Sequence, residues 1–161
     1  MKKSLFLIVS LAVFAIFNYG IYEKEQIKVH GQTVFLELAP VDPRSLMQGD
    51  YMRLRYAVER TTSSDINGPK KRGYMVIAPD DRGIARFVHF YGGESLQPGV
   101  RLLHYHEEYG GVRIVPDSFM FQEGQAELYR NAKYGEFKFD SAGHYILVGL
   151  ADEKLQRIMP H

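Results

Sequence analysis

The apolar positions of this chain fall into one unbroken run near the N-terminus and a series of short alternations after it. Residues 4–22 contain no charged side chain. About 20 helical residues at about 1.5 Å each cross the hydrocarbon core of a bilayer, so this run predicts a transmembrane helix. A cleaved signal peptide needs a small-residue site after its apolar region, and the residues that follow Phe17 are bulky. We therefore expect residues 1–25 to be an uncleaved anchor, with a cleaved signal peptide and a buried core helix as alternatives.

The charges beside this run predict its orientation. Lys2 and Lys3 precede it, and basic residues beside a membrane helix stay on the cytoplasmic side. We expect a single-pass protein of the inner membrane with a cytoplasmic N-terminus. Residues 26–161 would then form a periplasmic or other extracytoplasmic domain.

The remainder of the chain has the pattern of antiparallel β structure. Apolar and polar residues alternate over short stretches that Gly and Pro interrupt about every ten residues. The expected strands are 33–38, 51–59, 74–78, 84–90, 100–106 and 112–115, followed by a hairpin of 135–140 with 144–150. One short helix is expected at 125–133, a turn or two of helix at 152–158, and an exposed loop at 60–72. The predicted fold is mainly β, a small antiparallel β-barrel or sandwich-like domain.

Composition excludes several classes of function. The formal net charge is +1 and the basic residues are dispersed, so the stripe that nucleic-acid binding requires is missing. The chain has no cysteine, which excludes disulfides, thiolate metal sites and a Cys nucleophile. Aromatic residues make up 13% of the chain and none is Trp, so Phe and Tyr must build the core.

Residues 49–56 read Gly-Asp-Tyr-Met-Arg-Leu-Arg-Tyr and carry the most specific pattern in the chain. Before them, Asp42 is placed to cap one helical turn, and Gly49 suits the positive φ that ends such a turn. In the strand that follows, alternate side chains face opposite ways. One face carries Met52, Leu54 and Tyr56, and the other carries Tyr51, Arg53 and Arg55.

Two interpretations of this segment stay open. In the structural one, Gly49 and Asp50 hold a tight turn and the tyrosines pack. In the functional one, Asp50, Arg53 and Arg55 form a polar face that binds a partner.

The chain resembles the GDYXXLXY family, and three further stretches extend the similarity. Residues 36–46 resemble the strand and D-P-R entry of the family, 116–126 resemble its F-x-x-E-G block, and 135–150 would be its closing hairpin. The family motif falls on Gly49, Asp50, Tyr51, Leu54 and Tyr56. The resemblance implies a membrane-anchored protein of unknown function that is often encoded beside a multi-pass membrane protein. It transfers no catalytic residue and no cofactor.

Two chemical alternatives can be drawn from single residues. Ser45, on an anchored β domain, faintly resembles the nucleophile of type I signal peptidases. Such enzymes need a lysine base, and the stretch that should carry it has Arg86 and His89 instead. His104 and His106 lie on one face of a predicted strand and would need His89 or His144 as a third ligand for zinc or copper.

The function favoured by the sequence is that of an accessory or interaction protein, not an enzyme. The apolar run would hold it in the bilayer, and an integral membrane protein would be its partner. Arg53, Arg55, Asp50 and Glu123 are the candidate partner-binding residues. The sequence leaves the oligomeric state open.

Overall fold

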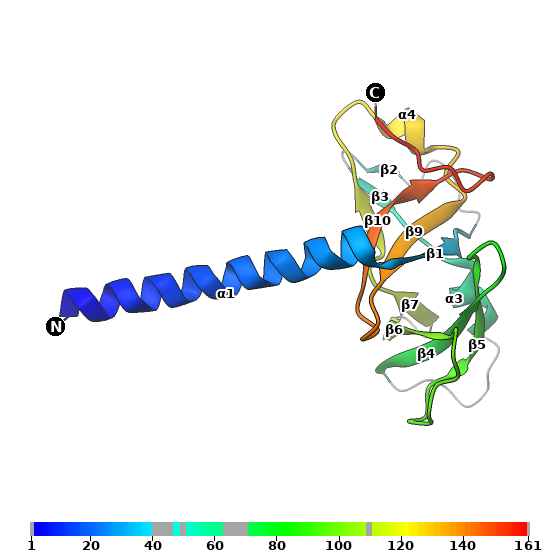
Figure 1. The fold of residues 1–161 in the computed structure, drawn as a ribbon. Coiled ribbons are helices and arrows are strands. Elements are labelled where there is room, and N and C mark those ends of the chain that lie inside the picture. The colour runs from blue at the N-terminus through cyan, green and yellow to red at the C-terminus, as the bar shows by residue number, and fades with distance from the viewer. Residues whose placement is uncertain (1, 40–46, 49–50, 63–70, 109–110, 161) are drawn as a thin grey trace.

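A long helix that projects from a curled β domain is the dominant feature of the molecule (Figure 1). The computed structural model describes residues 2–39, 47–48, 51–62, 71–108 and 111–160. Helix α1 (Lys2–His30) passes directly into the first strand. It therefore continues past the predicted anchor boundary at residue 25.

Ten strands and two short helices follow α1 in the described part of the chain. The strands are β1 (Gln32–Glu37), β2 (Met47–Gln48), β3 (Tyr51–Arg53), β4 (Arg72–Pro79), β5 (Ala85–Phe90), β6 (Arg101–Glu108), β7 (Gly111–Ile114), β8 (Ser118–Met120), β9 (Tyr134–Phe139) and β10 (Tyr145–Ala151). The helices are α3 (Ala57–Thr62) and α4 (Ala126–Tyr129). The mainly β class predicted from the sequence is confirmed.

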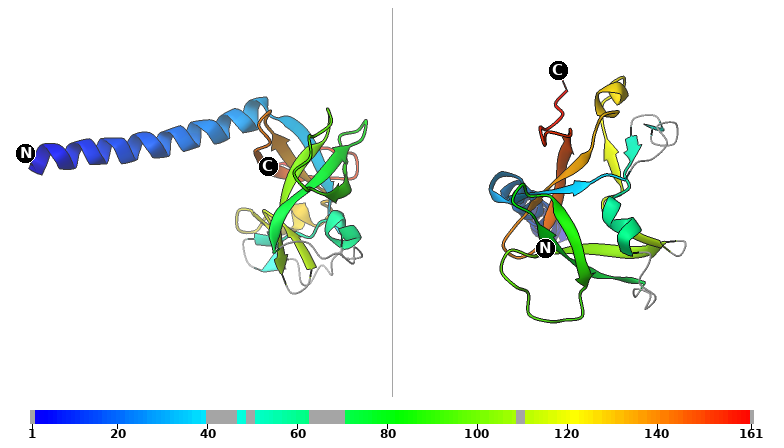
Figure 2. Two further views of the ribbon diagram at one scale, coloured as in Figure 1. Left: turned by 90° about the horizontal axis from the view of Figure 1, so that it is seen from below. Right: turned by 90° about the vertical axis from the view of Figure 1, so that its right-hand side faces the viewer.

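The strands form three antiparallel sheets that curl into a half-barrel (Figure 2). Their orders are β1-β9-β10, β2-β3-β8 and β5-β4-β6-β7. Strand β1 connects them, because Phe35 bridges Ile84 beside β5 and Leu38 bridges Tyr56. The Phe35 N–H donates to the Gly83 carbonyl at 2.8 Å. The curled sheets thus share one core.

Aromatic and aliphatic side chains fill this core. Phe137 packs at 5.8 Å from both Tyr56 and Tyr145 between ring centroids, within the range of favourable aromatic pairs. The fully buried side chains include Val34, Leu36, Tyr56, Met75, Ile77, Leu103, Ile114, Phe137, Phe139 and Leu150.

The predicted strands at both ends of the domain are confirmed. The closing hairpin is β9–β10, whose alternation buries Phe137 and Phe139 and leaves Lys138 half-exposed. In its turn, the Asp140 carboxylate accepts the His144 N–H at 2.8 Å, and Gly143 has a φ of 90°. Only glycine adopts such a φ readily.

Two predictions were wrong, at residues 51–62 and 152–158, whereas the short helix expected at 125–133 is confirmed in a shorter form. The predicted strand 51–59 ends at Arg53, and α3 begins at Ala57 and includes residues 60–62 of the predicted loop. The helix expected at 125–133 is a single turn, Ala126–Tyr129. No helix forms at 152–158, where the Asp152 N–H donates to the Gln156 carbonyl at 3.0 Å and Arg157 bridges to Ala151. The predicted helical turn after Asp42 lies mostly outside the described residues.

The junction between α1 and the domain is packed closely. Ile27 is 3% exposed, and α1 contacts β9 and β10. The Gly31 N–H donates to the Ile27 carbonyl at 2.8 Å, and a Cβ at Gly31 would collide with that carbonyl oxygen. A backbone collision of this kind can be relieved only by moving the chain. The helix therefore joins β1 through a fixed bend that requires glycine.

Candidate functional site

The described part of the signature, residues 51–56, begins with β3, the middle strand of the sheet β2-β3-β8. Its core face is as predicted, with Met52, Leu54 and Tyr56 all 3% exposed or less. On the other face, Arg53 is exposed and Arg55 is half-buried. The Leu54 N–H donates to the Asp117 carbonyl at 2.7 Å. This bond links the segment to the chain between β7 and β8, and the Leu38–Tyr56 bridge links it to the end of β1. Gly49 and Asp50 lie outside the described residues.

Tyr56 belongs to the core of the half-barrel and forms a hydrogen bond within it. Its side chain is fully buried, and its hydroxyl donates to the Pro116 carbonyl at 2.8 Å. Burial raises the pKa of Tyr56 well above its usual value, so its hydroxyl stays protonated. A Cβ at Gly135 would lie 3.2 Å from the Tyr56 ring and 3.1 Å from the Phe137 ring. The last tyrosine of the motif thus fits a space that glycine leaves open.

A buried carboxylate beside the signature was not predicted from the sequence. Glu59, on α3, is 5% exposed, and its Oε1 accepts the Ile114 N–H at 3.0 Å. Its Oε2 lies 3.3 Å from Arg113 Nη1 and 3.9 Å from Arg55 Nη1. The carboxylate therefore links α3, β7 and the signature segment.

Burial and hydrogen bonding act in opposite directions on this group. Burial raises the pKa of Glu59 to about 7, and the Ile114 N–H and the Arg55 guanidinium limit the rise. Glu59 therefore changes its charge near neutral pH. Arg55, a predicted partner-binding residue, belongs to this cluster, whereas Arg53 faces solvent.

The candidate metal ligands do not converge. His104 lies edge-on against Tyr74, with 5.3 Å between ring centroids, and its backbone N–H donates to the Tyr145 hydroxyl at 3.2 Å. Among the described residues, no group of three His, Asp or Glu side chains could hold a metal ion. The proposed third ligands are engaged elsewhere: His89 lies 2.7 Å from Glu94, and His144 lies 2.9 Å from Asp140. His106 is half-buried on β6.

The hydrolase alternative gains no support from the described residues. Ser45 lies outside them. Arg86 is exposed on β5 and lines a shallow cleft with Arg82, Glu37 and the start of α3. A guanidinium does not deprotonate in proteins, so Arg86 cannot serve as a general base.

Glu123, a candidate partner-binding residue, does not cap the short helix α4. It is exposed in the turn before α4, and the N-cap residue is Gln125, which makes no side-chain capping bond. Glu123 therefore remains accessible to a partner.

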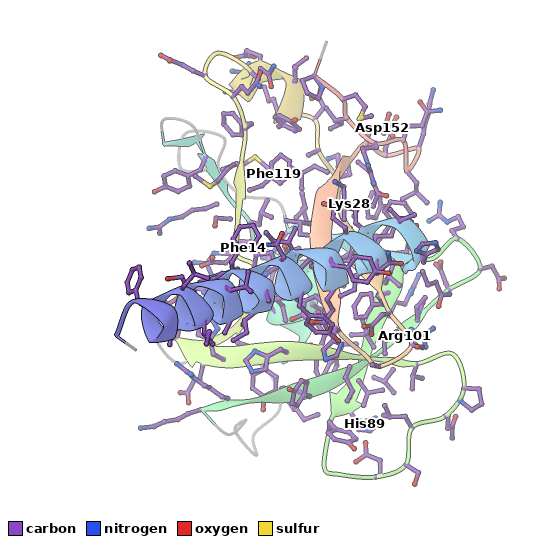
Figure 3. The ribbon with its side chains drawn as sticks, turned by 60° about the vertical axis from the view of Figure 1, so that its left-hand side comes forward. Phe14, Lys28, His89, Arg101, Phe119 and Asp152 are labelled. Carbon is purple, nitrogen blue, oxygen red and sulfur yellow. The ribbon has the colours of Figure 1, made fainter. Side chains whose placement is uncertain are left out.

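A second cleft lies where α1 meets the domain. Glu23, Ile27, His30, Arg101 and Asp140 are among its lining residues. Figure 3 shows Arg101 below the end of α1 and His89 farther away on the β5 side. The Arg101 guanidinium donates to the Val100 carbonyl at 2.8 Å and to the Gln32 side chain. Its remaining N–H groups are engaged by no carboxylate in the described chain.

Helix α1 has the length and composition of a membrane-crossing helix. The candidate span covers Phe6–His30, with a mean hydropathy of 1.7 in its most apolar window, and none of that window is buried against the domain. A signal sequence shares these properties. The structure thus presents one N-terminal apolar helix suited to a bilayer.

Comparisons with known proteins agree with the signature. A family model described as GDYXXLXY protein matches residues 13–150, from the middle of α1 to the end of β10. No curated protein and no solved structure matches the chain.

Proposed function

The chain belongs to the GDYXXLXY family, and from that premise we propose that it is a membrane-anchored accessory protein. Helix α1 holds the β domain at the outer surface of the cytoplasmic membrane. There the domain binds an integral membrane partner. The proposal assigns no catalysis to the chain.

The observation that carries this proposal is the continuous helix Lys2–His30. Its most apolar window makes no contact with the domain, so lipid is the environment that suits its side chains. Residues 23–30 continue the same helix for about 12 Å beyond the apolar run. Ile27 and Gly31 then fix the domain to its end. A domain fixed at this height is well placed to contact the outer loops of a neighbouring membrane protein.

The chemistry of the signature and of the neighbouring Glu59 also favours binding over catalysis. The polar atoms of Tyr56 and Glu59 are engaged by backbone groups or arginines within the domain. Arg53 is exposed on the same segment and is free to meet a partner's surface. We propose Arg53 and Glu123 as contact residues, both exposed in the described chain.

Membrane anchoring is tested on the full chain in its native cells. We expect the protein to stay in the pellet after alkaline carbonate, to keep its N-terminal residues by sequencing, and to be cut by protease added outside spheroplasts. A mature chain that lacks residues 1–22, or complete protection from protease, would contradict the proposal.

Partner binding is tested by affinity purification of the full chain from detergent extracts. We expect an integral membrane protein to co-purify, and Arg53→Ala to weaken its recovery. Arg72→Ala is the matched control, because Arg72 is also exposed but lies at the start of β4. Equal losses for both variants, or recovery of the chain alone, would refute the proposed surface.

A further inference from the structure

Asn18 places a polar side chain within the apolar stretch of α1. Its Nδ2 donates to the Phe14 carbonyl of its own helix at 2.8 Å. A carboxamide has two N–H groups and two acceptor sites, so this single bond, the one the structure describes, leaves most of its capacity unused. Asn18 lies four residues, or about 6 Å, inside the end of the apolar run, beyond the reach of its short side chain to water. Unpaired polar groups at such depth are costly, and they usually face another helix.

The position of Asn18 around the helix also leaves it accessible. Asn18 and Ile27 are nine residues apart, which is two and a half turns, so they lie on opposite sides of α1. Ile27 packs against the domain, and the Asn18 side therefore points away from it. Figures 1 and 2 show the N-terminal stretch of α1 projecting alone. A second helix can pack along this side without meeting the β domain.

One stripe of side chains runs along this side of the helix. Its members are spaced alternately by four and three residues, the spacing of a helix–helix seam. They are Leu7, Leu11, Phe14, Asn18 and Ile21, all exposed. Beyond the apolar run the stripe continues with Glu25 and Lys28, whose side chains lie 3.4 Å apart. This pair is neutral in sum, so two copies of the stripe do not repel each other.

We propose that the Asn18 stripe binds a second copy of the chain in a parallel two-helix dimer. A carboxamide both donates and accepts, so two Asn18 side chains pair reciprocally across a two-fold axis. Two copies inserted in the same direction bring these groups to the same depth without further adjustment. Any other partner must supply a matching polar group at that depth from its own sequence. The inference rests on the proposed membrane anchoring and adds the partner that α1 binds within the bilayer.

The chain offers a clean test because it has no cysteine. A single cysteine is introduced at Leu11, on the stripe, or at Val9, which is nine residues from Asn18 and therefore on the opposite side. The full chain is reconstituted in lipid vesicles at low protein-to-lipid ratio and treated with a membrane-permeant oxidant. We expect Leu11→Cys to form disulfide-linked dimers and Val9→Cys, at nearly the same depth, to form few.

The role of the carboxamide is tested by adding Asn18→Leu or Asn18→Gln to the Leu11→Cys chain. Interhelical hydrogen bonds of this type predict a roughly 3- to 30-fold weaker dimer for Asn18→Leu. Asn18→Gln, which keeps the carboxamide, should retain most of the cross-linking. Equal cross-linking of Leu11→Cys and Val9→Cys, or no loss with Asn18→Leu, would overturn the dimer.

Two further outcomes separate the dimer from the anchoring. Release of the chain from vesicles by alkaline carbonate overturns both, because the stripe would not then be in lipid. Retention in vesicles with no preference for Leu11→Cys overturns the dimer and leaves the anchor intact. In native membranes, Leu11→Cys cross-linked to a different protein in place of a second copy would also refute the dimer.

Discussion

Replacing the buried Glu59 with glutamine should remove a large part of the pH dependence of folding. Burial raises the pKa of this carboxyl from 4.5 to about 7 in the folded protein. The folded state therefore holds the proton more tightly than the unfolded chain. The resulting stabilisation is complete below about pH 4.5 and is lost as the pH rises through 7.

The size of this change in stability follows from the difference between the pKa of Glu59 in the unfolded and in the folded protein. At about 1.4 kcal/mol per pKa unit, the shift corresponds to about 3 kcal/mol of unfolding free energy between pH 4.5 and 8. A glutamine in place of Glu59 would still accept the Ile114 N–H through its amide oxygen but would not titrate. We therefore expect Glu59→Gln to lose little stability as the pH rises across this window, in contrast to the wild type.

The assay is urea unfolding of the full chain in a non-ionic detergent, followed by tyrosine fluorescence, since the chain has 11 Tyr and no Trp. Glu108→Gln is the control, because Glu108 also pairs with Arg113, at 3.2 Å, but its side chain is 45% exposed. This control should keep the wild-type slope. The three proteins differ only at residues 59 and 108, so a slope that changes in Glu59→Gln alone reports Glu59. Equal slopes for wild type and Glu59→Gln, or wild-type stability that rises with pH, would show that the arginines outweigh burial.

Two further substitutions test contacts that close the barrel. Tyr56→Phe should lower the unfolding free energy by about 1–2 kcal/mol in the same assay, because it leaves the Pro116 carbonyl without its donor. An unchanged urea midpoint would show that water replaces the hydroxyl. Arg157→Ala should cost about 1–3 kcal/mol, because the buried Glu136 loses two hydrogen bonds of 2.6 Å each. Adding Glu136→Gln to Arg157→Ala should recover part of that loss, and no recovery would assign the cost to packing instead.

Local sequence patterns predicted the strands whose two faces differ in environment and the one long apolar helix. The hairpin β9–β10 was found because Phe137 and Phe139 alternate with polar residues and a turn sequence follows. Helix α1 was found because its apolar run is long and carries no charge. In the signature, the alternation correctly assigned Met52, Leu54 and Tyr56 to the core. Each of these signals is complete within a short stretch of chain.

The errors arose where distant contacts decide the structure. The aromatic and branched residues up to Val58 favour a strand, but packing of α3 against β7 selects a helix from Ala57 onward. The burial of Glu59 was not predicted, because two of the groups that hold it, Ile114 and Arg113, are more than 50 positions away. No local pattern reveals such a partner.

The close junction between α1 and β1 couples the tilt of the helix to the orientation of the β domain. Residues 4–22 are about 28 Å long as a helix, close to the roughly 30 Å of a typical hydrocarbon core, so an upright helix fits such a bilayer. A thinner bilayer would force the helix to lean. Because Ile27 and Gly31 leave no hinge where the helix joins the domain, that lean would be transmitted to the whole barrel. Lipid thickness would thereby set which surface of the barrel faces its neighbours.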